Sequence, residues 1–371
     1  MKRVLFVTNY PSPYRVHFYD ELGKYMDVTV LFSDRAEDKT HRDAAWFVSG
    51  EGGFRKVQLT RRIAGWGKRN LCADVISWLK KDFDAIVICG YSSPTAMLAM
   101  AWLRMKGIPF YMEVDGGLVR QESRAKYLYK KLLVSAPSCW ISSGAHTTDY
   151  LVHYGAKREK TFLYPFTSLW ERDILPRIPS PEEKQRLRRE RGMTEEKIVV
   201  YVGRFTEAKG MDALLGAAAS LDRDTGVYFI GGEPEPAHLD FCREQGLQNV
   251  HFVGFQKKEA LALYYQAADL LVLPTKSDVW GLVINEAMAC GLPVITTDRC
   301  VAGLELIRDG VNGYVVPVDD PQALREKIRA VVTDDYRKMG AAALETIRPY
   351  TLENMAKAHV EIFDREFPCE C

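Results

Sequence analysis

The sequence has no long hydrophobic run. Its longest uninterrupted apolar stretch spans residues 96–103, far below the roughly 18 apolar residues of a membrane-spanning helix. The apolar segment at residues 4–7 is too short for a secretory signal and is soon followed by Asn9 and Pro11. We therefore expect a cytoplasmic protein that is either free in solution or held at the inner face of a membrane.

Cysteine pairs and metal-ligand clusters are also missing. The eight cysteines are scattered, without a CxxC pair or a Cys/His group at zinc spacing. Two Asp-x-Asp strings, at residues 82–84 and 222–224, precede predicted strands, where acidic turn residues are common. The sequence predicts reduced thiols, no metal site and no cofactor.

The whole chain has almost no net charge, at +1, but the charge is divided unevenly. Residues 1–165 carry 25 Lys/Arg against 16 Asp/Glu, a balance of +9, and residues 166–371 carry 25 against 33, a balance of −8. The near neutrality of the whole and the lack of a recognised binding motif argue against a nucleic-acid partner.

Basic and aromatic residues alternate in two clusters of the first half. Such clusters suit an anionic membrane surface or a lipid-diphosphate acceptor, and ordinary solvated helix faces account for them equally well. Their members are Arg61, Arg62, Trp66, Lys68 and Arg69, and then Arg124, Lys126, Tyr127, Tyr129, Lys130 and Lys131.

Short β-like runs alternate with helical patterns throughout, which predicts an α/β fold with parallel sheets. The chain of 371 residues, 47% hydrophobic, is long enough for two cores. We place the first domain at residues 1–168 and the second at 169–350, with the proline-containing, charged stretch 165–191 as the connection. The predicted strands are Val4–Thr8, Val28–Phe32, Ala85–Cys89, Phe110–Val114 and Cys139–Ser142, and then runs beginning at Ile198, Val227, Val250, Leu270 and Val294.

The segment from Thr275 to Val294, TKSDVWGLVINEAMACGLPV, combines two carboxylates with a helix start. A buried strand ends before it, and a helix is predicted to begin near Gly281, where unpaired amides and the helix dipole favour a phosphate. Asp278 and Glu286 are placed to bind hydroxyl-rich rings at either end of a diphosphate. The alternative stays open that Asp278 caps the helix and Glu286 is solvated.

A second motif follows the strand that begins at Ile198. It contains Gly203, Arg204, Lys209 and Gly210, with two cations at the strand end where ligands bind in open α/β sheets. Positive charge there suits a departing diphosphate. A common strand-to-helix turn with two solvated cations is the alternative.

Together the motifs resemble those of retaining glycosyltransferases of family 4, whose acidic motif has the spacing of Pro274, Asp278, Gly281 and Glu286. The resemblance implies the GT-B fold, in which two Rossmann-like domains have parallel sheets facing a central cleft. It also implies that residues 351–371 form a helix crossing back to the acceptor-binding first domain. In the donor-binding second domain, Arg204 and Lys209 with the amides of Leu282 and Val283 would bind the diphosphate, Glu286 the ribose and Asp278 the sugar.

The first domain departs from the commoner family pattern. Its first loop is stiffened by two prolines, and Tyr10 and Arg15 either hold an acceptor or belong to a rigid turn before a helix near Arg15. Asp115 stands where many relatives have histidine, as a catalytic carboxylate or a turn residue. Tyr91 and Ser92 are weaker acceptor-site candidates.

We therefore expect a metal-independent retaining glycosyltransferase. Its donor would be a nucleotide sugar, with UDP as the expected nucleotide, and its acceptor a saccharide or lipid-linked hydroxyl in bacterial cell-surface polysaccharide or glycolipid synthesis. A nucleotide-sugar 2-epimerase of the same fold and a non-catalytic nucleotide-sugar-binding protein are the alternatives.

Overall fold

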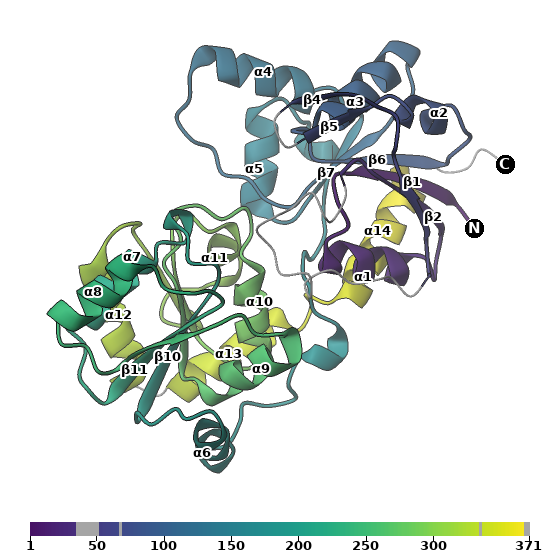
Figure 1. Cartoon of the computed structure of the whole chain (residues 1–371). Coiled ribbons are helices and arrows are strands. Elements are labelled where there is room, and N and C mark those ends of the chain that lie inside the picture. Colours follow the sequence, from purple (N-terminus) through teal and green to yellow (C-terminus); the bar gives the residue numbers. More distant parts are fainter. Residues whose placement is uncertain (35–51, 67–68, 334–335, 367–371) are drawn as a thin grey trace. The chain divides into compact units, whose positions relative to one another are not determined.

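The computed structural model of the chain describes residues 1–34, 52–66, 69–333 and 336–366 (Figure 1). It divides into two compact units, Met1–Ser168 with Tyr350–Cys371, and Leu169–Pro349. Each unit is built around a parallel sheet, so the α/β fold predicted from the alternating pattern is confirmed.

The sheet of the first unit has the strand order β3-β2-β1-β6-β7-β8-β9. An antiparallel hairpin, β4–β5, lies outside it. The strands are β1 Arg3–Thr8, β2 Asp27–Phe32, β3 Arg55–Gln58, β4 Arg62–Trp66, β5 Arg69–Cys72, β6 Ala85–Cys89, β7 Tyr111–Val114, β8 Cys139–Ser142 and β9 Thr161–Leu163. The helices are α1 Pro13–Leu22, α2 Val75–Leu79, α3 Pro94–Lys106, α4 Arg124–Val134, α5 Ala145–His153 and α14 Leu352–Glu366.

The last helix, α14, packs against α1 of the same unit. Its buried residues Leu352, Met355, His359 and Phe363 recur at helical spacing, which places them on one face. The ring of His359 lies 4.7 Å from that of Phe18 on α1, centroid to centroid. The C-terminal segment therefore completes the core of the unit that the N-terminus begins.

The sheet of the second unit has the order β12-β11-β10-β13-β14-β15. Figure 1 shows helices on both of its faces, α7, α8 and α12 on one and α9, α10 and α13 on the other. The strands are β10 Lys197–Val202, β11 Thr225–Ile230, β12 Val250–Val253, β13 Leu270–Leu273, β14 Val294–Thr297 and β15 Gly313–Val316. The helices are α6 Pro181–Glu190, α7 Met211–Ala218, α8 Pro236–Glu244, α9 Lys258–Ala267, α10 Leu282–Ala289, α11 Val301–Leu306, α12 Pro321–Thr333 and α13 Tyr336–Ile347.

The connection after the first unit and several strands outside the sheet centres differ from the sequence expectations. The predicted connection 165–191 contains α6, which Ser180 begins with a capping box and which belongs to the second unit. The edge strand β3 was not expected, because its sequence RKVQ is mostly polar and no side chain in it is fully buried. Edge strands of this kind lack the apolar run that marks a central strand.

Candidate functional site

The two motifs of the second unit lie together at the carboxyl edge of its sheet. Residues 203–210 follow β10, residues 274–281 follow β13, and these strands are neighbours. The strand order changes direction between them, since β10 leads to β11 on one side and β13 to β14 on the other. Ligands of open α/β sheets bind at this switch point. Gly203 is tied into the sheet by its amide, which donates to the carbonyl of Ile230 at 3.0 Å.

Direct hydrogen bonds join the two loops. The carbonyl of Ala208 accepts from the Thr275 hydroxyl and from the Lys276 amide, both at 2.9 Å. Gly210 permits this approach, because its φ is 66° and a Cβ there would lie 1.9 Å from the carbonyl oxygen of Pro274. Both a left-handed backbone and a missing side chain are therefore required at this position.

An ion pair also links the loops. The Lys209 ammonium donates a hydrogen bond to Oδ2 of Asp278, and the side chains are 19% and 16% exposed. The Asp278 amide donates to the carbonyl of Arg299 at 3.0 Å. The N-cap of α10 is Gly281, without a side-chain cap, so the interpretation of Asp278 as a simple helix cap is wrong.

The start of α10 is fixed by buried neighbours. Gly281 has a φ of 104°, and a Cβ there would lie 2.7 Å from the sulfur of Cys300. Trp280 is 2% exposed, so the aromatic ring of the motif packs inside the unit. The amides of Leu282 and Val283 are the first of the helix, where the dipole favours an anion.

Arg204 and Glu286 have different surroundings. Arg204 is exposed, and its carbonyl accepts a hydrogen bond from the Tyr201 hydroxyl at 3.0 Å. Glu286 is half-buried, and its Oε2 accepts from the Tyr265 hydroxyl at 3.3 Å. Burial, together with the Glu286 carboxylate, raises the pKa of Tyr265 and keeps this hydroxyl protonated as a donor. Glu286 is thus oriented by a neighbour and is not a freely solvated helix residue.

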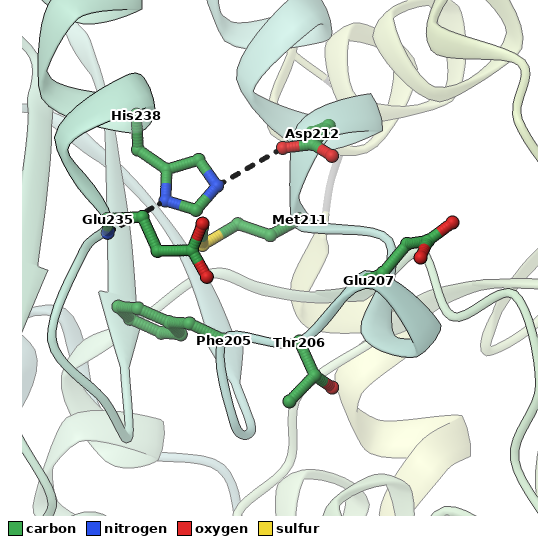
Figure 2. Close-up of a pocket in the computed structure, with 7 residues that line it drawn as sticks. All are labelled: Phe205, Thr206, Glu207, Met211, Asp212, Glu235 and His238. Atoms are coloured by element: carbon green, nitrogen blue, oxygen red, sulfur yellow. Dashed lines mark hydrogen bonds and ion pairs between the residues drawn. The ribbon is translucent and has the colours of Figure 1, made fainter.

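A pocket of about 120 Å³ lies beside the loop after β10 (Figure 2). His238 bridges its wall, with Nε2 3.3 Å from Oδ1 of Asp212 and with Nδ1 accepting from the Glu235 amide at 3.1 Å. Three carboxylates line this pocket and would repel a phosphate. None of the predicted site residues lines it. The lining residues are Phe205, Thr206, Glu207, Met211, Asp212, Glu235 and His238.

In the first unit, Arg15 and Asp115 are brought together. Arg15 lies on α1 and is 5% exposed, and its Nη2 donates to Oδ1 of Asp115. Its Nη1 donates to Oε1 of Glu113 at 2.5 Å. The Tyr164 hydroxyl also donates to Oδ1 of Asp115, at 3.0 Å. Arg15 is therefore a buried anchor for two carboxylates, and its direct contact with an acceptor stays a prediction.

Glu113 and His359 belong to this cluster and were not predicted. Both are fully buried, Glu113 in β7 and His359 in α14. Nδ1 of His359 donates to the carbonyl of Met355 at 2.8 Å, and Nε2 lies 3.8 Å from Oε2 of Glu113. A lone acid within the apolar strand YMEV was a usable signal for Glu113. No local feature of the sequence connects it with a histidine on the last helix.

The two carboxyl groups bonded to Arg15 have pKa values that are shifted in opposite directions. Burial alone would raise the pKa of Glu113, but Arg15 and His359 together lower it to about 2. Burial and the repulsion by Glu113 raise the pKa of Asp115, although the attraction of Arg15 acts to lower it. Carboxyl groups whose pKa values move apart suit different roles. Glu113 stays ionised, and Asp115 takes up a proton more readily.

The other predicted acceptor residues lie at neighbouring strand ends. Tyr10 is half-buried after β1, and Tyr91 and Ser92 follow β6. The hydroxyls of Tyr91 and Tyr150 share a hydrogen bond, so the Tyr91 ring is directed at α5. Because β1, β6 and β7 are adjacent and parallel, these residues share one edge of the sheet with Asp115.

Acidic, His and Cys side chains occur throughout the described residues. No three acidic, His or Cys side chains gather there in a way that could hold a metal ion. Nor does this part of the chain contain a helix long and apolar enough to cross a membrane. Six cysteines are free thiols, and Cys369 and Cys371 lie outside the described residues.

Residues 183–346 match the family of glycosyl transferases group 1. A curated relative, the uncharacterized glycosyltransferase MJ1607 of Methanocaldococcus jannaschii, is 32% identical over 67% of this chain and 65% of its own length. Other curated relatives, among them D-inositol 3-phosphate glycosyltransferases, are matched over 42% to 60% of their own length.

Solved structures resemble the whole chain. The sucrose-phosphate synthase of Thermosynechococcus elongatus is 20% identical, with a TM-score of 0.76 over 99% of both chains. Anabaena Alr3699/HepE in complex with UDP is 18% identical, with a TM-score of 0.75 over 97% of this chain and 98% of its own. At such identities the likeness concerns the fold, and it confirms the fold class expected from the sequence. The second unit is therefore similar to the glycosyl transferases group 1, and the whole chain has the α/β fold of GT-B glycosyltransferases.

Proposed function

We propose that this chain is a retaining glycosyltransferase of family 4, which moves a sugar from a nucleoside diphosphate, with UDP as the expected nucleotide, to a hydroxyl acceptor. The observation that carries the proposal is the pair of joined loops at the switch point of the second sheet. There Asp278 is paired with Lys209. Its Oδ2 lies 3.7 Å from the point where a Cβ would stand on Gly281, at the start of α10. The UDP bound to the similarly folded HepE supports the choice of nucleotide.

The diphosphate is proposed to lie between the two loops. Arg204 and Lys209 supply positive charge from one loop, and the amides of Leu282 and Val283 supply donors from the other. A diphosphate would compete with Asp278 for the Lys209 ammonium, because both are anions within reach of the same cation. Donor binding would then free the Asp278 carboxylate to accept hydrogen bonds from the sugar.

Glu286 is proposed to bind the ribose hydroxyls. A carboxylate has two oxygens and accepts several hydrogen bonds, so Oε2 can keep the bond from Tyr265 while the group accepts from two vicinal hydroxyls. The half-buried position favours this role, since hydrogen bonds to a charged acceptor are stronger where water is partly excluded.

The proposed chemistry is mainly electrostatic. The bond between the anomeric carbon and the diphosphate oxygen breaks, and a bond to the acceptor oxygen forms on the same face of the sugar. Arg204, Lys209 and the helix start stabilise the charge that develops on the diphosphate. A diphosphate oxygen takes the acceptor proton, so the proposal requires no metal ion and no further cofactor. Asp115 is proposed to bind the donor sugar or to orient the acceptor hydroxyl.

The proposed setting is bacterial cell-surface polysaccharide or glycolipid synthesis, with a saccharide or lipid-linked acceptor. We propose a cytoplasmic location, which the free thiols favour because disulfides are rare in reducing compartments.

A screen of nucleotide sugars by thermal unfolding tests the proposal. Binding at about a hundredfold excess over the dissociation constant adds about 2.7 kcal/mol of apparent stability. Saccharide and lipid-linked acceptors are then added with the stabilising donor, and free UDP is measured. Acceptor-dependent release of UDP with a new glycoside supports the proposal. Conversion of the donor to its C2 epimer, or binding without any turnover across the acceptor panel, contradicts it.

A further inference from the structure

One helix of the first unit presents an apolar stripe to solvent. On α4, Leu128, Tyr129 and Leu132 are 53%, 50% and 61% exposed. With the exposed Ala125 they have the spacing i, i+3, i+4 and i+7, which places them on one face. A helix of a single-chain protein normally turns such a face to the core.

Within the stripe, the Tyr129 hydroxyl donates to Sδ of Met97 on α3 at 3.3 Å, but the buried side of α4 is the opposite face. Val134 is fully buried, and the ring of Tyr127 lies 5.6 Å from that of Tyr154 on the neighbouring chain segment. Lys130 is 2.7 Å from Glu122 and donates to the Tyr154 hydroxyl at 3.1 Å. These contacts fix the rotation of the helix, so the exposed stripe is a consequence of stable packing.

Cations flank the stripe on both sides. At about 3.6 residues per turn, Arg124 and Lys131 lie along one side of it and Lys126 along the other. All three are exposed, and α4, with the sequence RAKYLYKKLLV, contains no acid. The nearest acid, Glu122, is 8% exposed and bonded to Lys130. Of these three cations, Lys126 also lies near Glu122, with its Nζ 3.8 Å from Oε2.

We propose that this face of α4 rests on an anionic lipid surface. The leucines would enter the boundary between headgroups and acyl chains, and the tyrosine ring would lie at the headgroup level. The flanking cations have long apolar stems that let their charges reach lipid phosphates. The inference rests on the arrangement of α4 alone and does not depend on the proposed transferase activity.

Charge favours a lipid surface over a second copy of the chain. In a symmetric dimer through α4, the same patch would face itself. Arg124, Lys126 and Lys131 would then meet their own counterparts without an acid between them, which costs affinity. An anionic bilayer satisfies the apolar stripe and the cations together. The surplus of +9 in residues 1–165, counted as 25 Lys/Arg against 16 Asp/Glu, acts in the same direction.

Sedimentation with vesicles tests the proposal. The full chain is mixed with vesicles of phosphatidylcholine, with or without phosphatidylglycerol, at low and high salt. We expect binding only to the vesicles with phosphatidylglycerol, and weaker binding at high salt. Exchange of Lys126 and Lys131 together for Gln should weaken it about 25-fold, at about fivefold for each cation near an anionic surface.

A second pair of variants tests the apolar stripe. Leu128→Glu with Leu132→Glu should lower binding at least about tenfold, because apolar area no longer enters the lipid. Leu239→Glu is the matched control, since Leu239 is 43% exposed on α8 of the acidic unit, and it should bind as the wild type does. All variants should keep the wild-type midpoint of thermal unfolding.

Three results would overturn the proposal. The first is equal binding to vesicles with and without phosphatidylglycerol, and the second is unchanged binding of the leucine variant. The third is a wild-type chain that does not bind vesicles but forms concentration-dependent dimers, which the leucine variant does not form.

Discussion

Arg15 donates through Nη1 to Oε1 of Glu113 at 2.5 Å, and their side chains are 6% and 0% exposed. The pair joins helix α1 to strand β7 inside the first unit. Removal of one partner from a buried pair leaves the other charge uncompensated, which is costlier than loss of the pair as a whole.

We predict that Arg15→Met lowers the free energy of unfolding by about 3–5 kcal/mol. Glu113→Gln added to Arg15→Met should recover part of this loss, because it removes a buried charge. Urea unfolding of both single variants and the double variant measures the coupling. Arg61→Met, at an exposed position, is the control and should change stability little. If the stability losses of the two single variants simply add up in the double variant, Arg15 and Glu113 are not energetically coupled, which contradicts the prediction.

The same pair makes stability depend on pH. The pKa of Glu113 is about 2 in the folded protein, below its value in an unfolded chain, near 4.3. Its contribution is therefore fully present above the unfolded pKa and is lost as pH falls through the folded one. The stability difference between the wild type and Glu113→Gln should shrink from pH 5 to about 2.

Gly210 offers a test of the contact between the two loops of the proposed donor site. We predict that Gly210→Ala is destabilising for two reasons, its left-handed backbone and the collision with the carbonyl of Pro274. Gly246 has nearly the same φ, 63° against 66°, but nothing lies within 4 Å of its Cβ position. Gly246→Ala should cost about 1–2 kcal/mol for the backbone alone. Gly210→Ala should cost about 1–3 kcal/mol more, and equal losses in chemical denaturation would contradict the tight contact.

Asp115→Asn tests the proposed role of the Asp115 carboxylate. Asn keeps an oxygen for the Tyr164 hydroxyl but loses the charge that pairs with Arg15. Activity should fall about 10- to 100-fold, the equivalent of one hydrogen bond to a charged group, while calorimetry should show unchanged UDP binding. Unchanged turnover and acceptor KM would make Asp115 a structural partner of Arg15 only.

Turnover tests the two proposed cations of the donor site. We predict that Lys209→Ala and Arg204→Ala each lower kcat by about 10²–10³, as when one stabilising donor of a developing charge is lost. Lys257→Ala, at a basic residue outside both donor-site loops, is the control and should keep wild-type turnover. Wild-type kcat in either folded site variant would contradict its role at the leaving group.

Local patterns predicted the central strands closely, because buried parallel strands are continuous apolar runs. The expected strand Val4–Thr8 is β1 Arg3–Thr8, and Ala85–Cys89 is found as β6 with the same bounds. The hairpin β4–β5 was missed, since its pairing is irregular between Arg62 and Ala64 and its sequence does not alternate cleanly. Of the basic cluster in this region, Lys68 lies outside the described residues.

Ion pairs between residues far apart in the chain could not be predicted from the sequence. Lys209 and Asp278 are 69 residues apart, and Arg15 and Asp115 are 100 apart. Each motif predicted a position at a strand end, but which strand ends are neighbours depends on the order of the whole sheet. The sequence therefore predicted that both motifs stand at strand ends, whereas the ion pair that links the two loops could not be predicted from it.

Calorimetric titration of UDP and of an intact UDP-sugar is the most direct test of the donor site. Glu286→Ala should weaken both ligands, because the ribose is common to them. Asp278→Ala should weaken the UDP-sugar and leave UDP at least as tight as in the wild type, because the ammonium of Lys209 is no longer shared. Equal losses of UDP and UDP-sugar in Asp278→Ala, or wild-type affinity for both in Glu286→Ala, would contradict the account.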